Sequence, residues 1–68
     1  EYIDLKDAAG LSEDELAVIY VLSRGEKQAD EIIQETGMDA SDVLSAITML
    51  ELEGYIRVND GQRFELTR

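Results

Sequence analysis

The chain has 68 residues, close to the lower limit at which a domain folds around a core without disulfides or a metal ion. It contains neither Cys nor His, which excludes disulfides, thiolate metal sites, thiol catalysis and catalysis by a histidine base. Sixteen acidic against six basic residues give a net charge of −10, which repels nucleic-acid phosphates and anionic membranes.

Residues 1–10, EYIDLKDAAG, are predicted to form a linker or a docked N-terminal arm, and residues 11–68 to form the domain. Tyr2, Ile3 and Leu5 give the arm enough apolar surface to lie on the domain, and small residues end it in a turn. Because the chain begins at Glu1 rather than at Met, we expect it to be a segment of a longer protein.

The first predicted helix spans roughly residues 12–23. Ser12 followed three residues later by Glu15 is a capping box, and three consecutive acidic residues suit the positive end of the helix dipole. This start signal favours a helix over a strand for the apolar run LAVIYVL at residues 16–22. Gly25 is expected to end the helix.

The run LAVIYVL carries apolar side chains on both sides of this helix. A helical wheel directs four residues toward the core: Leu11, Val18, Ile19 and Leu22. Leu16 and Tyr20 point nearly the opposite way, and Val21 lies to one side. Because a helix that is apolar all round is usually covered all round, three alternatives stay open for Leu16 and Tyr20. They are covered by the N-terminal arm, contact a partner or a second copy, or are exposed to solvent.

Two further helices are predicted at about residues 29–36 and 40–53. Gly37 suits a left-handed exit from the second helix, and Asp39 is expected to cap the third. The residues expected to face inward are Ile32, Ile33, Val43, Ala46, Ile47 and Leu50. A helix, a glycine-containing turn and another helix at this spacing predict a helix-turn-helix.

The C-terminal part of the chain is typical of a β-hairpin. Gly54 ends the third helix, and the β-forming runs YIRV and RFEL surround Asn59-Asp60-Gly61, a strong turn signal. Residues near Lys27 are expected to add a short third strand. The predicted fold class is therefore α+β, a winged helix-turn-helix of three helices followed by a β-hairpin wing.

The outer face of the third helix is the surface that such a fold presents to DNA. The wheel places on this face Ser41, Ser45, Thr48 and Leu52, flanked by Asp42 and Met49. DNA-reading helices use Arg, Lys, Asn or Gln to reach base edges, and cations to hold phosphates. Since this face has neither, we interpret it as a solvated face or as a protein-binding stripe rather than as a reader of DNA.

The predicted wing carries a small basic patch on an acidic body. Arg57 and Arg63 are expected on opposite strands, with Lys27 beside them. Either these cations form local salt bridges, for example with Glu65, or they make a weak and salt-sensitive contact with DNA phosphates.

No arrangement of residues predicts catalysis. Neighbouring carboxylates such as Glu51 and Glu53 face different ways, and no nucleophile, metal triad or phosphate-binding glycine loop accompanies them. We therefore predict that the domain is not an enzyme and holds no cofactor or metal. No apolar run approaches the roughly 18 residues that cross a bilayer, and no secretory signal is present. We expect a cytoplasmic domain without membrane contact.

Five short motifs carry a family resemblance. They are LS at the start of the first helix, DEI in the second, TGM at the turn, LSAITMLELEGYI across the third helix, and GQRFEL in the wing. Together they make residues 11–66 resemble the C-terminal winged-helix domain of the DNA-processing protein A (DprA/Smf) family.

The resemblance implies an accessory domain of a protein of the natural-transformation type, in which a Rossmann-like core binds single-stranded DNA and loads a recombinase. The motif of that core is not in these residues. For this domain of the family, contact with DNA and contact with protein are both open. The composition of the exposed faces favours protein–protein interaction, weak self-association or regulation of the core, with the rest of its own chain or another protein as partner. The residues expected to carry this role are Leu16 and Tyr20, with Ser45, Thr48, Met49 and Leu52 as a second surface. Two alternatives stay open: a DNA-binding module that uses Lys27, Arg57 and Arg63, and an acidic transcriptional-regulator domain.

Overall fold

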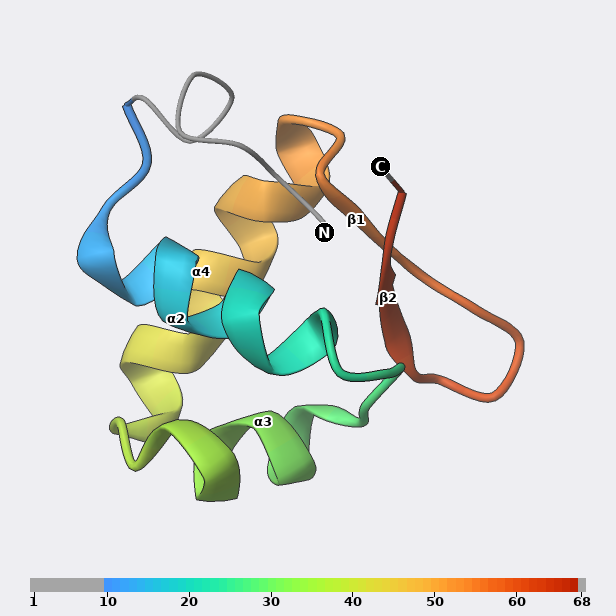
Figure 1. Cartoon of the computed structure of the whole chain (residues 1–68), viewed down its shortest axis with the longest axis horizontal. Coiled ribbons are helices and arrows are strands. Elements are labelled where there is room, and N and C mark those ends of the chain that lie inside the picture. Colours follow the sequence, from blue (N-terminus) through green and yellow to red (C-terminus); the bar gives the residue numbers. More distant parts are fainter. Residues whose placement is uncertain (1–9, 68) are drawn as a thin grey trace.

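The computed structural model describes residues 10–67. Within this part of the chain, three helices precede a two-stranded hairpin: α2 (Glu13–Leu22), α3 (Ala29–Thr36), α4 (Ala40–Leu52), β1 (Ile56–Val58) and β2 (Phe64–Leu66). The helices pack on one another, and the hairpin stands beside them as a wing (Figure 1). The predicted α+β winged helix-turn-helix is confirmed. The predicted N-terminal arm lies outside the described residues except for Gly10.

Helix α2 begins as the sequence predicts. The Glu15 backbone N–H donates to Ser12 Oγ at 3.1 Å, and the Ser12 N–H donates to Glu15 Oε1 at 2.8 Å, which completes the capping box. The end of the helix differs from the prediction, because Ser23 rather than Gly25 occupies the C-cap position. The Ser23 N–H donates to the Ile19 carbonyl at 2.8 Å and its hydroxyl donates to the Tyr20 carbonyl at 2.6 Å. Gly25 still contributes to the helix end, because its N–H donates to the Leu22 carbonyl at 3.1 Å.

The turn between α3 and α4 forms the helix-turn-helix. Gly37 has a φ of 72°, the left-handed conformation expected at this helix exit. At the start of α3, the Gln28 N–H donates to Glu31 Oε1 at 2.9 Å. Asp39 occupies the N-cap position of α4, as predicted, but its side chain accepts no capping hydrogen bond. The Thr36 hydroxyl instead supports the turn, because it accepts from the Met38 N–H at 3.3 Å.

The core lies where the three helices meet the first strand. It contains Val18, Ile19, Val21, Leu22, Ile32, Val43, Ala46, Ile47, Leu50 and Ile56. Val21, which the wheel places to one side, is also buried, and α2 contacts the hairpin as well as α3 and α4. Leu11 and Ile33 were expected inside and are partly buried against this cluster.

The wing is an antiparallel pair in which Ile56 faces Leu66, Arg57 faces Glu65 and Val58 faces Phe64. The expected third strand is present as a single bridge, in which the backbones of Lys27 and Phe64 exchange hydrogen bonds of 3.1 and 2.7 Å. Strand β2 therefore forms backbone hydrogen bonds with the loop before α3 as well as with β1. Since Leu50 and Ile56 belong to one core, the wing is fixed relative to α4.

Candidate functional site

Helix α4 holds the position of the second helix in the helix-turn-helix, and its outer side is exposed. Of the residues predicted to lie there, Ser45, Thr48, Met49 and Leu52 are all exposed. Leu52 is 76% exposed, Met49 is 45% exposed, and Leu44, which the wheel analysis omitted, is 50% exposed. We call these five residues the α4 face. The face is thus more apolar than predicted from the helical wheel, because Leu44 belongs to it.

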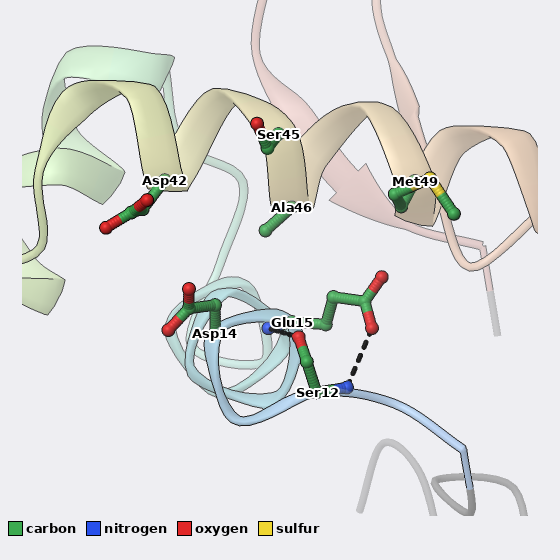
Figure 2. Close-up of a pocket in the computed structure, with 7 residues that line it drawn as sticks. All are labelled: Ser12, Asp14, Glu15, Asp42, Ser45, Ala46 and Met49. Atoms are coloured by element: carbon green, nitrogen blue, oxygen red, sulfur yellow. Dashed lines mark hydrogen bonds between the residues drawn. The ribbon is translucent and has the colours of Figure 1, made fainter.

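Two adjoining hollows lie along the α4 face. The first has a volume of about 220 Å³ and separates α4 from the start of α2 (Figure 2). Its lining residues are Ser12, Asp14, Glu15, Asp42, Ser45, Ala46 and Met49. The second hollow is lined by Leu44, Ser45, Thr48 and Met49. Ser45 and Met49 line both hollows, so the two hollows adjoin along the outer side of α4, and we refer to them together as the groove.

The first hollow has an apolar floor and an acidic border. Figure 2 shows the carboxylates of Asp14 and Asp42 near one end and that of Glu15 below Met49. Glu15 is buried, and its Oε1 accepts from the Ser12 N–H, so the capping box fixes its carboxylate at this place. No basic residue occurs between positions 39 and 53. The local potential around the α4 face is therefore negative.

The other predicted interaction pair, Leu16 and Tyr20, lies on α2. Both side chains are exposed, and neither lines the two hollows of the α4 face. The structure thus brings Ser45, Thr48 and Met49 together and keeps Leu16 and Tyr20 apart from them. Leu52 extends the α4 face beyond the hollows.

Each basic side chain in residues 10–67 forms an ion pair. Arg57 Nε lies 2.6 Å from Glu65 Oε2, and the Arg63 guanidinium lies 3.8 Å from Glu26 Oε1. Lys27 Nζ lies 3.1 Å from Glu35 Oε2, and the Arg24 guanidinium lies 3.9 Å from the same carboxylate, on Oε1. Lys27 is beside the hairpin through its backbone, as expected, but its charge is directed to α3. The predicted basic residues are therefore distributed over three separate carboxylates.

Asn59 connects the ion pairs of the wing, a role that is not predicted from the sequence. Its Nδ2 donates to Glu26 Oε1 at 3.1 Å and to Glu65 Oε1 at 3.3 Å, while its Oδ1 accepts from the N–H groups of Gly61 and Arg63. The hydrogen bonds from Arg57 and then Asn59 hold the pKa of the Glu65 carboxyl below its usual range. An Asn at the first position of a hairpin turn was the available signal.

Within residues 10–67, no group of three or more carboxylates is arranged to hold a metal ion. No helix in the same range is long and apolar enough to cross a membrane. The described surface carries an apolar groove with an acidic border on α4, and cations paired with carboxylates at the wing.

Comparisons with known proteins agree with this architecture. The family model described as the DprA winged helix domain matches residues 6–62. The phenylalanine–tRNA ligase alpha subunit of Sulfolobus acidocaldarius is 35% identical over 60 residues, which cover 84% of this chain and 13% of that protein. The chain thus spans a small part of the length of that relative. No solved structure matches the chain.

Proposed function

Because the chain belongs to the DprA winged helix domain family, we propose that it is the accessory domain of a DNA-processing protein and that its α4 face binds protein rather than DNA. Its partner is the Rossmann-like core of the same protein, which it regulates, or another protein acting in natural transformation. The observation that carries this proposal is the composition of the α4 face.

Helix α4 lacks the side chains that read DNA. Residues 39–53 contain no Arg, Lys, Asn or Gln, the four residue types that make bidentate or cationic contacts to bases and phosphates. Phosphate contacts supply most of the affinity of DNA-binding proteins, and the net charge of −10 opposes them. A DNA duplex placed against α4 would meet Asp42 and Asp14 instead of cations.

The α4 face has the properties of a protein contact. Leu44, Met49 and Leu52 leave three large apolar side chains in water on one side of a helix. Surface residues of this kind occur singly in most proteins, whereas a group of them bordered by polar residues marks an interaction site. Ser45 and Thr48 add small hydroxyl groups between them, and the Thr48 hydroxyl already donates to the Leu44 carbonyl at 2.9 Å.

DNA binding through the wing is the alternative function. Arg57 and Arg63 are exposed and lie on the hairpin, where winged-helix proteins can contact a phosphate backbone. Each is paired with a carboxylate, so a phosphate would have to displace Glu65 or Glu26. Two such cations, even with Lys27 beside them, would give weak binding that disappears with salt.

A titration of the labelled chain with duplex and single-stranded oligonucleotides distinguishes these functions. Amide spectra at 50 and 150 mM NaCl are expected to show no saturable shifts along residues 41–52, and any binding to be weaker than about 1 mM. Binding that Arg57→Glu combined with Arg63→Glu abolishes would support the wing alternative. Saturable shifts along residues 41–52 at physiological salt would contradict the proposed function.

Leu16 and Tyr20 support weak self-association as a second contact. Burying both side chains stabilises a complex by at most roughly 3–5 kcal/mol. A dissociation constant of about 1 mM corresponds to −4.1 kcal/mol, so only weak dimers are expected after the entropic cost of association. Sedimentation of the wild type beside Leu16→Asp at about millimolar concentration tests this. A monomeric wild type under those conditions would exclude it.

A further inference from the structure

We propose that the α4 face binds a cationic amphipathic helix of a partner protein, with the apolar side chains of that helix on the groove and its Lys or Arg residues against the acidic border. This inference rests on the proposed function and specifies its partner. It depends on how charge and apolar surface alternate around α4.

Exposed acidic side chains flank the apolar stripe of α4 on both sides. Asp14 and Asp42 lie on the side of the first hollow and Glu51 on the other, and these three residues form the acidic border of the α4 face. On a helical wheel Leu44, Thr48 and Leu52 form the centre of the exposed arc, with Glu51 on one side and Asp42 on the other. All three of Glu51, Asp42 and Leu52 are exposed. Asp14 of α2 adds to the Asp42 side, because both line the first hollow.

The carboxylates of the acidic border form no ion pair within residues 10–67. Every ion pair formed by the basic side chains of residues 10–67 involves Glu26, Glu35 or Glu65. Asp14, Asp42 and Glu51 therefore have no cationic partner within the part of the chain that the structure describes. A partner with cations on both sides of an apolar stripe would complement this surface without displacing any existing pair.

The same charges disfavour the other occupants. In a symmetric dimer through the α4 face, the acidic border of one copy would lie against the acidic border of the other, which opposes association. Nucleic acid and anionic lipid are repelled in the same way. A neutral apolar segment would use the groove but leave the border without partners. An amphipathic helix with cationic flanks is the partner that satisfies both features.

The groove also suits a helix in size. Helix α4 contains 13 residues, so its axis is about 20 Å long. Anchors at i, i+3, i+4 and i+7 of a partner helix cover about 10 Å of such a surface. The apolar side chains from Leu44 to Leu52 span a comparable length, with the hollows beside Ser45 and Met49 to receive the anchors.

Three matched helical peptides of about 18 residues test this partner chemistry, the length being five helical turns. One has an apolar Leu stripe flanked by Lys, one has the same stripe flanked by Glu, and one has the same Lys positions with Ser in place of Leu. Amide spectra of the chain are expected to show the Leu/Lys peptide binding at least about tenfold more tightly than either of the others. The shifts should map to residues 41–52 and Asp14.

Variants with equal charge changes separate the α4 face from general attraction. Asp42→Asn combined with Glu51→Gln is expected to weaken Leu/Lys binding about tenfold at 50 mM NaCl and to reduce its salt dependence. The control Asp30→Asn combined with Asp60→Asn removes two exposed charges elsewhere and should change it less than about twofold. Leu52→Ser should weaken it at least about threefold through lost apolar contact.

The outcomes separate the two proposals. Equal binding of the Lys/Ser and Leu/Lys peptides, or equal weakening by both double variants, would mean unspecific charge attraction and overturn the cationic-helix partner. Preferred binding of the Leu/Glu peptide to residues 41–52 would overturn it while leaving a protein contact on α4 intact. Saturable shifts along residues 41–52 on addition of duplex DNA alone, without any peptide, would overturn the proposed function as well.

Discussion

The Glu65 carboxylate receives two hydrogen bonds, and this makes the stability of the wing depend on pH. Arg57 Nε donates to Oε2 at 2.6 Å and Asn59 Nδ2 donates to Oε1 at 3.3 Å, and these bonds lower the pKa of Glu65. A carboxyl whose pKa is lower in the folded state adds stability above its unfolded pKa, about 4.3 for Glu. That contribution is lost as the pH falls through the folded pKa.

We therefore expect Glu65→Gln to lower the free energy of unfolding at pH 7 and to have a decreasing effect as the pH falls below about 4.3. Urea unfolding of both proteins between pH 7 and pH 2 measures the difference. Asp60→Asn is the control, because it removes a wing carboxylate that has no ion pair among residues 10–67. A difference between wild type and Glu65→Gln that does not change with pH would contradict the assignment.

Gln62 has a φ of 61°, the left-handed conformation that costs a residue with a side chain roughly 1–2 kcal/mol. Gly61, next to it, lies outside that region, and a Cβ added there would meet only Asn59 Oδ1 at an ordinary distance of 3.5 Å. Gln62→Gly removes this strain but makes the unfolded chain more flexible, which offsets part of the gain. The free energy of unfolding is therefore expected to rise by about 0.5 kcal/mol. Thermal unfolding measures the change.

Gly61→Ala is the matched variant and should also stabilise by about 0.4–1 kcal/mol, because it restricts only the unfolded chain. Loss of stability in Gly61→Ala together with no gain in Gln62→Gly would mean that the left-handed residue of the turn is Gly61. The sequence favours that assignment through its Asp-Gly pair. In the structure, Asn59 Oδ1 accepts from the N–H groups of Gly61 and Arg63, and the left-handed residue is Gln62, one position after Gly61.

At the scale of single elements, the starts of α2 and α4 look alike in sequence and differ in structure. Ser12 Oγ accepts from the Glu15 N–H, whereas the Asp39 side chain accepts no capping bond. Ser12→Ala should thus lower the free energy of unfolding by about 1 kcal/mol, and Asp39→Ala by less than about 0.5 kcal/mol through the helix dipole alone. Equal losses in chemical denaturation would show that Asp39 caps α4 in solution.

Local signals in the sequence predict these elements well because each start or end depends on residues close by. The capping box at Ser12, the left-handed Gly37 and the periodic Val43, Ala46, Ile47 and Leu50 place the helices within one or two residues of their observed ends. The turn signal at Asn59-Asp60-Gly61 likewise places the hairpin, but a two-residue turn at Asp60-Gly61 would pair Val58 with Arg63, whereas the structure pairs Val58 with Phe64. Burial of Val21 could not be predicted in this way, because it depends on tertiary packing around α2, which the wheel of a single helix does not show.

The candidate site was less predictable than the fold, since it joins residues that are distant in sequence. The wheel of α4 identifies Ser45, Thr48 and Met49 as outward-facing, and all three line the groove. It cannot show that Asp14 of α2 borders the same hollow, which requires the packing of α2 on α4. The pairing of Arg63 with Glu26 depends in the same way on the bridge between Lys27 and Phe64.

At the scale of the whole molecule, the charge of −10 acts over a body whose described part measures 29 × 25 × 21 Å. The Debye length is about 30 Å in 0.01 M salt, so every carboxylate then repels every other across the domain. In 1 M salt it is about 3 Å, and that repulsion is screened. The four ion pairs in residues 10–67 are screened as well, but exposed pairs contribute at most about 1 kcal/mol each.

Added salt is therefore expected to stabilise this domain, because the repulsion it removes exceeds the attraction it weakens. Raising NaCl from about 0.01 to about 0.5 M should raise the thermal midpoint by about 5 °C, which corresponds to roughly 1 kcal/mol for a domain of this size. Glu51→Gln combined with Glu53→Gln removes two carboxylates unpaired in the described range and should reduce the gain. A midpoint that falls with NaCl would mean that the pairs around Glu35 and Glu65 outweigh the net charge.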